Sequence, residues 1–266
     1  MALIPEAFIN SVVSIGVIEE EKTAWIGTGF IVGKKSISGG HYLYLVTNWH
    51  IIEKAKKSNK DRIYIRLREK ETKIIKKYSL NPNSFNVSVD KNIDIAICSL
   101  DAKILQEQID KLGFFDIDSN AFTSDEFFEN GGAEGSSIYM LGFPMGLVGD
   151  YSCLPICRMG CVARIDKEEL NSTKNMLLDI QNFPGNSGSP IICKGDMFSV
   201  EKTKSINKVA LIGIVYSYIP YEESLINTQT ERVVEIKSEN SGIALANPVE
   251  FIKQLIDDCA LKNGQS

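Results

Sequence analysis

The sequence is a succession of short apolar runs, rich in β-branched and aromatic residues and separated by turn-forming residues. Runs of this kind are typical of strands, and their spacing predicts an all-β barrel or sandwich. A first set of predicted strands lies at residues 11–18, 26–33, 42–47, 62–68, 73–78 and 93–100. A second set lies at residues 137–142, 157–165, 176–180, 190–193, 209–216 and 242–246.

The two sets of strands are joined by residues 114–135, which are rich in Asp, Glu, Phe and Gly. We interpret this stretch as the connection between two units, residues 1–118 and 119–266, with one helical turn inside it. Near the C-terminus, Asn247 precedes Pro248, and apolar residues then recur at helical spacing. A capping residue followed by proline is typical of a helix start, so a helix is predicted over residues 247–262.

A serine between two glycines is the most informative local motif, in the sequence Pro-Gly-Asn-Ser-Gly-Ser-Pro of residues 184–190. Gly185 and Gly188 allow backbone conformations closed to other residues, so consecutive amides can face inward beside the Ser187 hydroxyl. Acyl transfer needs such donors, because they stabilise the oxyanion that forms next to the attacking oxygen. An ordinary turn between two strands is the alternative, and composition alone favours it.

The chain contains two histidines, so a serine nucleophile has little choice of general base. His50 ends a strand-like run, where a side chain is rigidly placed and still reaches a cleft. His41 follows Gly39-Gly40, a turn signal, and is expected to be an exposed hairpin residue. We therefore predict His50 as the base, although a lone histidine is more often an ordinary, partly buried residue.

Asp94 is a carboxylate inside an apolar, β-branched run. Burying a charge there is costly unless a partner compensates it. An aspartate that orients His50 and stabilises its imidazolium would have such a partner. Asp90 is the alternative, and we favour Asp94 for the orienting role.

Four motifs in order carry a family resemblance: Gly27-Thr28-Gly29-Phe30, Leu45-Val46-Thr47-Asn48-Trp49-His50, Asp94-Ile95-Ala96 and Gly185-Asn186-Ser187-Gly188-Ser189-Pro190. Together with residues 211–215 and 241–248 they resemble the signatures of chymotrypsin-like (trypsin-like) serine proteases. Digestive zymogens carry Asp before the serine, and a newly cut N-terminus pairs with it. Asn186 stands there in this chain, which resembles the bacterial branch, the high-temperature-requirement proteases and the glutamyl endopeptidases. Neither activation by N-terminal cleavage nor a following PDZ domain is expected.

The resemblance implies two antiparallel Greek-key β-barrels side by side and a C-terminal helix, with His50 and Asp94 on the first barrel and Ser187 on the second. It also implies a serine endopeptidase that forms an acyl-enzyme, without a cofactor, and whose oxyanion hole is made by the amides of Gly185 and Ser187. The substrate-binding residues that it implies are Gln181, Tyr216, Ser217, Tyr218 and Ala244. Because no carboxylate stands at position 181, a neutral or mildly polar substrate side chain is expected.

Charge and composition argue against several other classes. The net charge of −5 is modest and no block of like charges occurs, so nucleic acid is not an expected partner. No apolar run approaches the roughly 20 residues of a membrane span, and the first residues lack the basic and apolar pattern of a secretory signal, so none is expected. Six cysteines, most of them in apolar runs, are expected as free thiols in a reducing cytoplasm.

Three of these cysteines, Cys153, Cys157 and Cys161, recur every fourth residue and imitate a metal site. Pro155 and Gly160 argue against the helix that would gather them on one face. In a strand they would spread over about 26 Å, at roughly 3.3 Å per residue. No metal site is predicted.

Two polar and weakly patterned stretches, residues 194–208 and 219–241, are interpreted as insertions. They either gate the site or dock a regulatory protein partner, or they are tolerated surface loops. A rival function for the whole chain is a catalytically silent barrel protein that binds a peptide or a protein partner. The intact set of His50, Asp94 and Ser187 argues against it. An esterase is a third interpretation, but the Gly-x-Ser-x-Gly elbow and the strand–helix alternation of that fold are missing.

Overall fold

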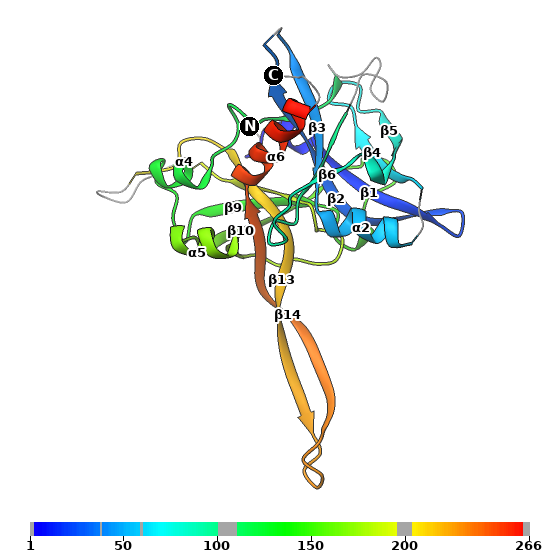
Figure 1. Cartoon of the computed structure of the whole chain (residues 1–266), viewed down its shortest axis with the longest axis vertical. Coiled ribbons are helices and arrows are strands. Elements are labelled where there is room, and N and C mark those ends of the chain that lie inside the picture. Colours follow the sequence, from blue (N-terminus) through cyan, green and yellow to red (C-terminus); the bar gives the residue numbers. More distant parts are fainter. Residues whose placement is uncertain (1–2, 38, 59–60, 101–110, 196–203, 263–266) are drawn as a thin grey trace.

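A computed structural model describes residues 3–37, 39–58, 61–100, 111–195 and 204–262. Two β-sheets dominate the structure, and a long two-stranded hairpin projects from one of them (Figure 1). The helices are α1 (Glu6–Ile9), α2 (Trp49–Lys57), α4 (Ser124–Glu129), α5 (Lys167–Thr173) and α6 (Val249–Lys262). The predicted all-β class is confirmed at this level, because most of the regular secondary structure in the described residues is strand.

The first sheet has eight strands in the order β5-β4-β1-β2-β3-β7-β6, with β8 paired to β2. They are β1 (Val12–Glu19), β2 (Lys22–Lys35), β3 (His41–Thr47), β4 (Ile63–Arg68), β5 (Ile75–Leu80), β6 (Asn86–Val87), β7 (Ala96–Ser99) and β8 (Phe115–Asp116). The prediction of a closed first barrel is wrong, since this sheet is open. Between β5 and β6 the chain makes a 3-10 turn at Pro82–Ser84, capped by Asn81. This turn connects the two end strands, β5 and β6, which do not pair with each other in the described residues.

The second sheet closes into a six-stranded barrel in the order β10-β11-β14-β13-β12-β9. Its strands are β9 (Ser137–Gly142), β10 (Ile156–Arg164), β11 (Met176–Asp179), β12 (Pro190–Cys193), β13 (Ala210–Ile226) and β14 (Val233–Pro248). One of the two predicted barrels is therefore present. The division of the chain at residue 118 stays a prediction.

Side-chain hydrogen bonds cap the N-terminal ends of two helices. Thr123 and Glu126 form a capping box at the start of α4, and the Asp166 side chain accepts hydrogen bonds from two amides at the start of α5. The helix predicted over residues 247–262 begins at Val249, because Asn247 and Pro248 still pair with β13. Helix α6 packs against β6 and β7 of the open sheet and against β13 and β14 of the barrel.

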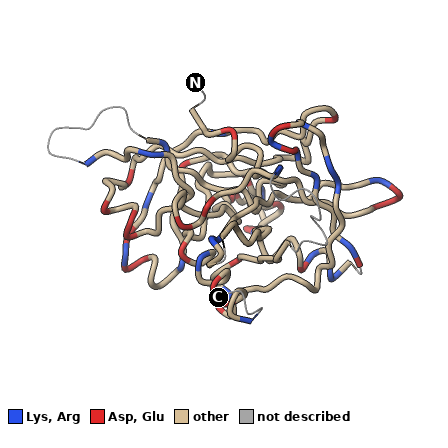
Figure 2. Tube along the Cα trace, turned by 90° about the horizontal axis from the view of Figure 1, so that it is seen from above, with Lys and Arg blue, Asp and Glu red and all other residues tan. Residues whose placement is uncertain are grey.

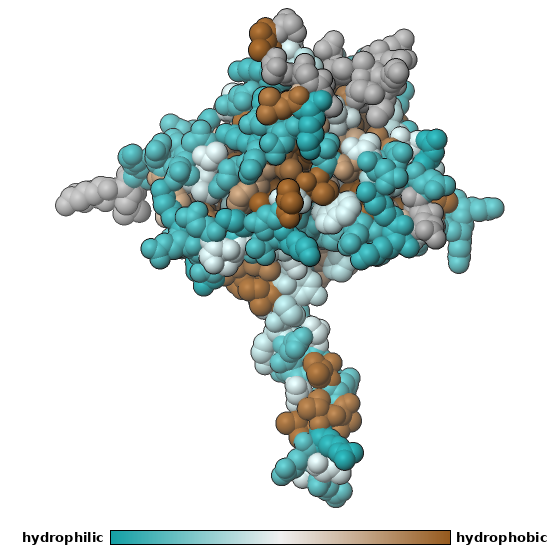
Figure 3. Space-filling view, viewed as in Figure 1, coloured by the Kyte–Doolittle hydropathy of each residue, from teal (hydrophilic) through white to brown (hydrophobic). Residues whose placement is uncertain are grey.

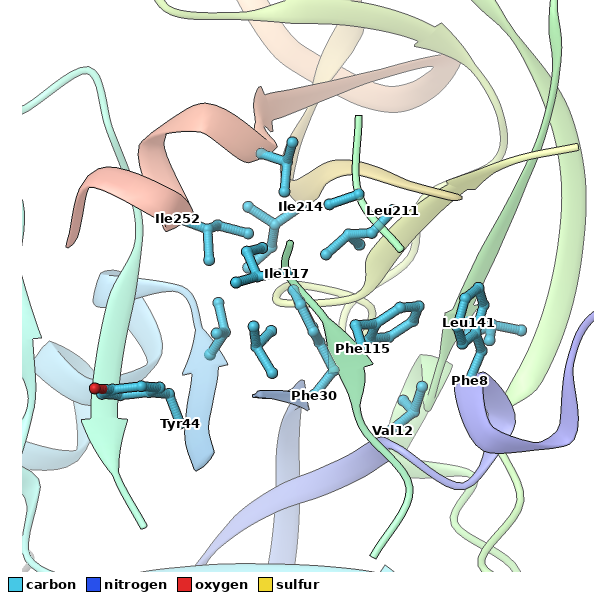
Figure 4. Close-up of a cluster of buried hydrophobic side chains, with 14 of the residues drawn as sticks. Phe8, Val12, Phe30, Tyr44, Phe115, Ile117, Leu141, Leu211, Ile214 and Ile252 are labelled. Carbon is cyan, nitrogen blue, oxygen red and sulfur yellow. The ribbon is translucent and has the colours of Figure 1, made fainter. Parts of the chain in front are cut away.

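One hydrophobic core runs through both sheets and under α6 (Figure 4). Phe30 and Tyr44 enter it from the open sheet, Ile214 from the barrel and Ile252 from α6, and all four side chains are fully buried. Each such side chain contributes about 1.5–3 kcal/mol on burial. Because the core is shared, packing fixes the orientation of the two halves and hence of any site between them.

Beyond the barrel, β13 and β14 continue as the projecting hairpin, and we call residues 219–241 the arm (Figure 1). The sequence predicted these residues to be an irregular insertion, but the arm is a regular antiparallel ribbon from Tyr221 paired with Glu239 to Leu225 paired with Glu235. At its tip the Asn227 side chain accepts hydrogen bonds from two amides of the turn. Consecutive polar residues at 222–224 and 237–241 break the alternation that indicates a strand, so the sequence did not reveal this pairing.

The other predicted insertion, residues 194–208, lies partly outside the described residues. Its last part is anchored, because Ile206 is buried in the barrel core and Lys204 donates a hydrogen bond to the Glu129 carbonyl. Acidic and basic residues are interspersed around the periphery of the molecule (Figure 2). Among the helices of the described residues, none has both the length and the apolar character needed to span a bilayer.

Candidate active site

Ser187 lies on the tight turn that joins β11 to β12. Gly185 and Gly188 have positive φ angles of 97° and 87°. A Cβ on Gly188 would come within 2.0 Å of the Thr28 carbonyl oxygen, so only glycine fits there. In the part of the chain that the structure describes, neither the Gly185 amide nor the Ser187 amide donates a hydrogen bond, which leaves both available to an acceptor.

Asn186, the residue before this serine, is buried beneath the turn. Its main chain closes the turn, because its amide donates to Phe183 at 3.0 Å and its carbonyl accepts from Ser189 at 2.9 Å. A charged aspartate at this depth would need a cation beside it. The neutral amide of Asn186 has no such requirement.

Two threonines of the open sheet hold the serine turn in place. Thr28, on β2, donates its amide to the Ser187 carbonyl at 2.9 Å and its hydroxyl to the Gly185 carbonyl at 2.7 Å. Its hydroxyl also accepts from the Phe143 amide at 3.0 Å. Thr47, at the end of β3, donates its hydroxyl to the Thr28 carbonyl at 2.7 Å. This buried chain of hydrogen bonds links the serine turn to the strand that leads into His50.

His50 and Asp94 are in direct contact. Asp94 lies just before β7, and its two carboxylate oxygens engage His50 at the ring Nδ1, at 2.5 Å, and at the main-chain amide, at 2.9 Å. The Asp94 main chain is held in turn by the side chains of Asn48 and Asn247. The Asp94 side chain is 17% exposed and that of His50 is 45% exposed, so the carboxylate is sheltered while the imidazole is accessible.

The two competing residues have other partners. Asp90 accepts a hydrogen bond from the Asn92 amide at 2.9 Å and so closes its own turn. His41 begins β3, where its ring packs 4.8 Å from that of Phe114 and its Nε2 lies 3.6 Å from a carboxylate oxygen of Asp116. His41 is therefore partly buried, not the exposed hairpin residue that the sequence predicted.

Tyr216, on β13, is a neighbour of both Ser187 and Asp94. The Ser187 hydroxyl donates to the Tyr216 carbonyl, with 3.4 Å between the oxygens. Burial, together with the neighbouring Asp94 carboxylate, raises the pKa of the Tyr216 hydroxyl to about 12. The side chain of Tyr216 is therefore neutral at physiological pH, and the same residue borders both Ser187 and Asp94.

The other residues implied in substrate binding lie along β13, β14 and the segment that leads to the serine turn. Tyr218 pairs with Ala244 across the ladder, and Ala244 is fully buried in the barrel core. Gln181 is exposed, with its Nε2 3.5 Å from where a Cβ on Gly242 would sit. The Ser217 carbonyl accepts a hydrogen bond from Asn182 Nδ2 at 2.9 Å.

Sequence reasoning missed two features of this neighbourhood. Asn182 is buried and ties the serine segment to β13, yet an asparagine in a turn gives no sequence signal for that role. Arg158, on β10, stacks over the Phe183 ring with its guanidinium carbon 4.9 Å from the centroid. Arg158, which is far from the serine turn in the sequence, thereby places a positive charge next to that turn.

No group of three or more His, Cys, Asp or Glu side chains within the described ranges is arranged to hold a metal ion. None of the six cysteines, all of which lie in the described residues, forms a disulfide, and Cys98, Cys153, Cys193 and Cys259 are buried.

A closed six-stranded barrel and an open sheet, with a C-terminal helix packed against both, form the frame of this site. A family model described as the trypsin-like peptidase domain matches residues 27–197, more than half of the chain, and the chain belongs to this family. Among solved structures, the chain is similar to the crystal structure of the Rv3671c protease in its inactive form, with 13% sequence identity and a TM-score of 0.46. That match covers 95% of this chain and 90% of the other. No curated protein matched the sequence.

Proposed function

We propose that the chain is a serine endopeptidase that hydrolyses peptide bonds through an acyl-enzyme. The observation that carries this proposal is the contact of Asp94 with His50, beside the open sheet whose Thr28 holds the Ser187 turn. A base with a sheltered carboxylate behind it and a serine between positive-φ glycines together match the requirements of acyl transfer.

In the proposed mechanism, the Ser187 hydroxyl attacks the carbonyl carbon of the substrate while His50 takes its proton. Asp94 accepts from the Nδ1–H group, so the opposite ring nitrogen, Nε2, acts as the base, and the carboxylate stabilises the imidazolium. The amides of Gly185 and Ser187 stabilise the oxyanion. The imidazolium then gives its proton to the leaving amine, and water hydrolyses the acyl-enzyme by the same steps.

The resting hydroxyl of Ser187 is directed to the Tyr216 carbonyl, at 3.4 Å. This distance is at the long limit for a hydrogen bond between oxygens. In the proposed reaction the hydroxyl has to exchange that acceptor for the imidazole of His50. The bond to Tyr216 is weak enough for such an exchange to cost little.

The proposed substrate preference is for a neutral or mildly polar side chain at the bond that is cut. Gln181 carries no charge that would pair with a basic residue. The Arg158 cation over Phe183 adds repulsion against a lysine or arginine next to the serine turn. A peptide library in which arginine dominates at the cleavage position would contradict this preference.

The function is tested by labelling with a fluorophosphonate, which reacts only with an activated serine. The wild-type protein should be labelled at Ser187 and should digest an unfolded protein such as reduced, alkylated casein. Ser187→Ala should abolish the label and lower turnover by about 10⁴-fold or more, by comparison with other triad enzymes. Labelling with no proteolysis would favour an esterase instead.

Ser189→Ala is the matched control, because Ser189 lies two residues away and its hydroxyl has no hydrogen-bond partner among the described residues. This variant should keep both the label and the proteolysis. A wild-type protein that is neither labelled nor active would refute the proposal and favour the catalytically silent binding protein.

A further inference from the structure

The arm exposes an unusual number of apolar side chains for an isolated ribbon. Exposure of 48–69% is found at Leu225, Ile226, Tyr221, Val233, Val234 and Ile236. Figure 3 shows hydrophobic surface on the arm well away from the body of the molecule. A two-stranded hairpin is marginally stable in water on its own, and contiguous exposed apolar surface marks an interaction site.

The arm is also acidic. Its charged residues number five acidic against two basic, a net charge of −3: Glu222, Glu223, Glu231, Glu235 and Glu239 against Arg232 and Lys237. This sign opposes docking on an anionic membrane. It also opposes docking of a second copy, because that copy would bring another acidic arm and a net charge of −5. The complementary occupant is a basic segment that carries apolar side chains.

The arm continues the strand that borders the candidate active site. Inside the barrel β12 pairs with β13 from Ala210 to Ile214, and Val215 still bonds to Gly188 and Ser189. Farther out, no strand of the described chain pairs with this edge of β13, which passes Tyr216 and runs on into the arm. Pro220 interrupts the row of amide donors once. The stretch from Tyr221 to Ile226 then offers about 20 Å of free edge, at 3.3 Å per residue.

The base of the arm is fixed relative to Ser187. Asn240 donates to the Asn182 carbonyl at 2.5 Å, and Asn182 donates to the Ser217 carbonyl at 2.9 Å. Ser241 donates to the Ile219 carbonyl at 2.5 Å across the ribbon. The arm therefore leaves the barrel in a set direction, from a point tied to the segment that carries the nucleophile.

We propose that the arm is a docking surface for an extended, basic and apolar segment of the protein substrate, N-terminal to the bond that is cut. The inference rests on the peptidase function proposed above. The direction follows from antiparallel pairing, which is the common way to add a strand to the edge of an antiparallel sheet. A segment antiparallel to β13 runs from the tip of the arm to its base, so its downstream end arrives at Ser187.

The test compares three fluorogenic peptides that share the same scissile bond. The sequence around that bond is chosen from the library peptides that the enzyme cuts. The first covers a few residues around the bond, the second adds ten residues of alternating lysine and leucine before it, and the third adds the same residues after it. The N-terminal extension should raise kcat/KM by about tenfold or more, since a second contact on one ligand adds avidity. The C-terminal extension should give no gain. Equal gains from both extensions would overturn the proposal.

The double variant Glu222→Lys/Glu235→Lys reverses two charges on the arm. It should bring kcat/KM for the N-terminally extended peptide close to kcat/KM for the short peptide, so that their ratio is near one. Asp61→Lys/Glu71→Lys makes the same change in charge at exposed positions on the body, and should keep the ratio of the wild type. An unchanged ratio in the arm variant would contradict the proposal, as would a wild-type dimer in sedimentation that the arm variant loses.

Binding to Ser187→Ala separates this inference from the peptidase function. Fluorescence anisotropy should show that the N-terminally extended peptide binds this variant more tightly than the short peptide, and that added salt and the arm charge reversal both weaken the difference. If the wild type cuts no peptide of the library, arm-dependent docking of a library peptide that carries the N-terminal extension would refute the peptidase function alone. Cleavage without an arm-dependent difference in binding would refute the docking surface alone.

Discussion

Thr28→Val is the perturbation that tests how the two halves position the serine turn. Valine keeps the shape of threonine but replaces its hydroxyl with a methyl group. Two buried main-chain groups lose their partner, the Gly185 carbonyl at 2.7 Å and the Phe143 amide at 3.0 Å. The bond from the Thr28 amide to the Ser187 carbonyl is made by the main chain and stays.

The expected loss in the free energy of unfolding follows from the two main-chain groups that lose their hydrogen-bond partner. A buried donor or acceptor left without a partner costs about 1–3 kcal/mol, so Thr28→Val should lower the free energy of unfolding by about 2–6 kcal/mol. Thr28→Ser keeps both hydrogen bonds and loses one methyl group, which is worth about 1 kcal/mol. Thr47→Val removes one hydrogen bond, to the Thr28 carbonyl. Its loss in the free energy of unfolding should lie between the losses of Thr28→Ser and Thr28→Val.

Urea unfolding followed by tryptophan fluorescence measures these differences, and fluorophosphonate labelling measures the effect on Ser187. The rate of labelling should fall about 10²-fold in Thr28→Val, since small displacements of a nucleophile carry large kinetic costs. It should stay near that of the wild type in Thr28→Ser. If the free energy of unfolding of Thr28→Val lies within about 0.5 kcal/mol of the wild-type value, this chain of hydrogen bonds does not hold the turn.

Three further predictions concern single positions. Gly188→Ala should unfold at a clearly lower temperature, because the new Cβ meets the Thr28 carbonyl at 2.0 Å and φ is +87°; a melting temperature near that of the wild type would contradict this. Asp94→Asn should lower kcat by about 10⁴-fold at pH 7 with the fold intact by circular dichroism, and a loss below tenfold would exclude an orienting role. Iodoacetamide at pH 8 should alkylate the exposed Cys157 before Cys153, whose pKa burial raises to about 11, so that about one thiol in a thousand is ionised. Mass spectrometry of the digested protein measures the order, and urea should abolish the difference.

Much of the fold was predictable because strand signals are local. The runs at residues 137–142 and 190–193 match β9 and β12, and continuous short runs of apolar residues between turn signals sufficed to find them. The closure of the first sheet could not be found in this way. Closure depends on whether the end strands β5 and β6 pair, which is a contact between separate segments that no local pattern reports, and in the described residues they do not pair.

The candidate site divides along the same line. The sequence alone points to Gly185, Gly188 and Asp94, because each residue is unusual in its local setting. The role of Thr28 does not, since its hydroxyl bonds to a residue 157 positions away. Arg158 is likewise an ordinary strand residue until the fold places it over Phe183.

This difference explains why a reaction type can be inferred from this sequence more easily than a substrate. The groups of the proposed reaction are few, chemically distinctive and held by short motifs at strand ends. Substrate recognition would instead depend on pairings across strands, such as Tyr218 with Ala244 and Asn182 with Ser217, and on an arm whose strands pair over residues that look like a polar loop. Each of those pairings can change by one residue without altering any motif, so specificity is expected to diverge among proteins that keep the same reaction.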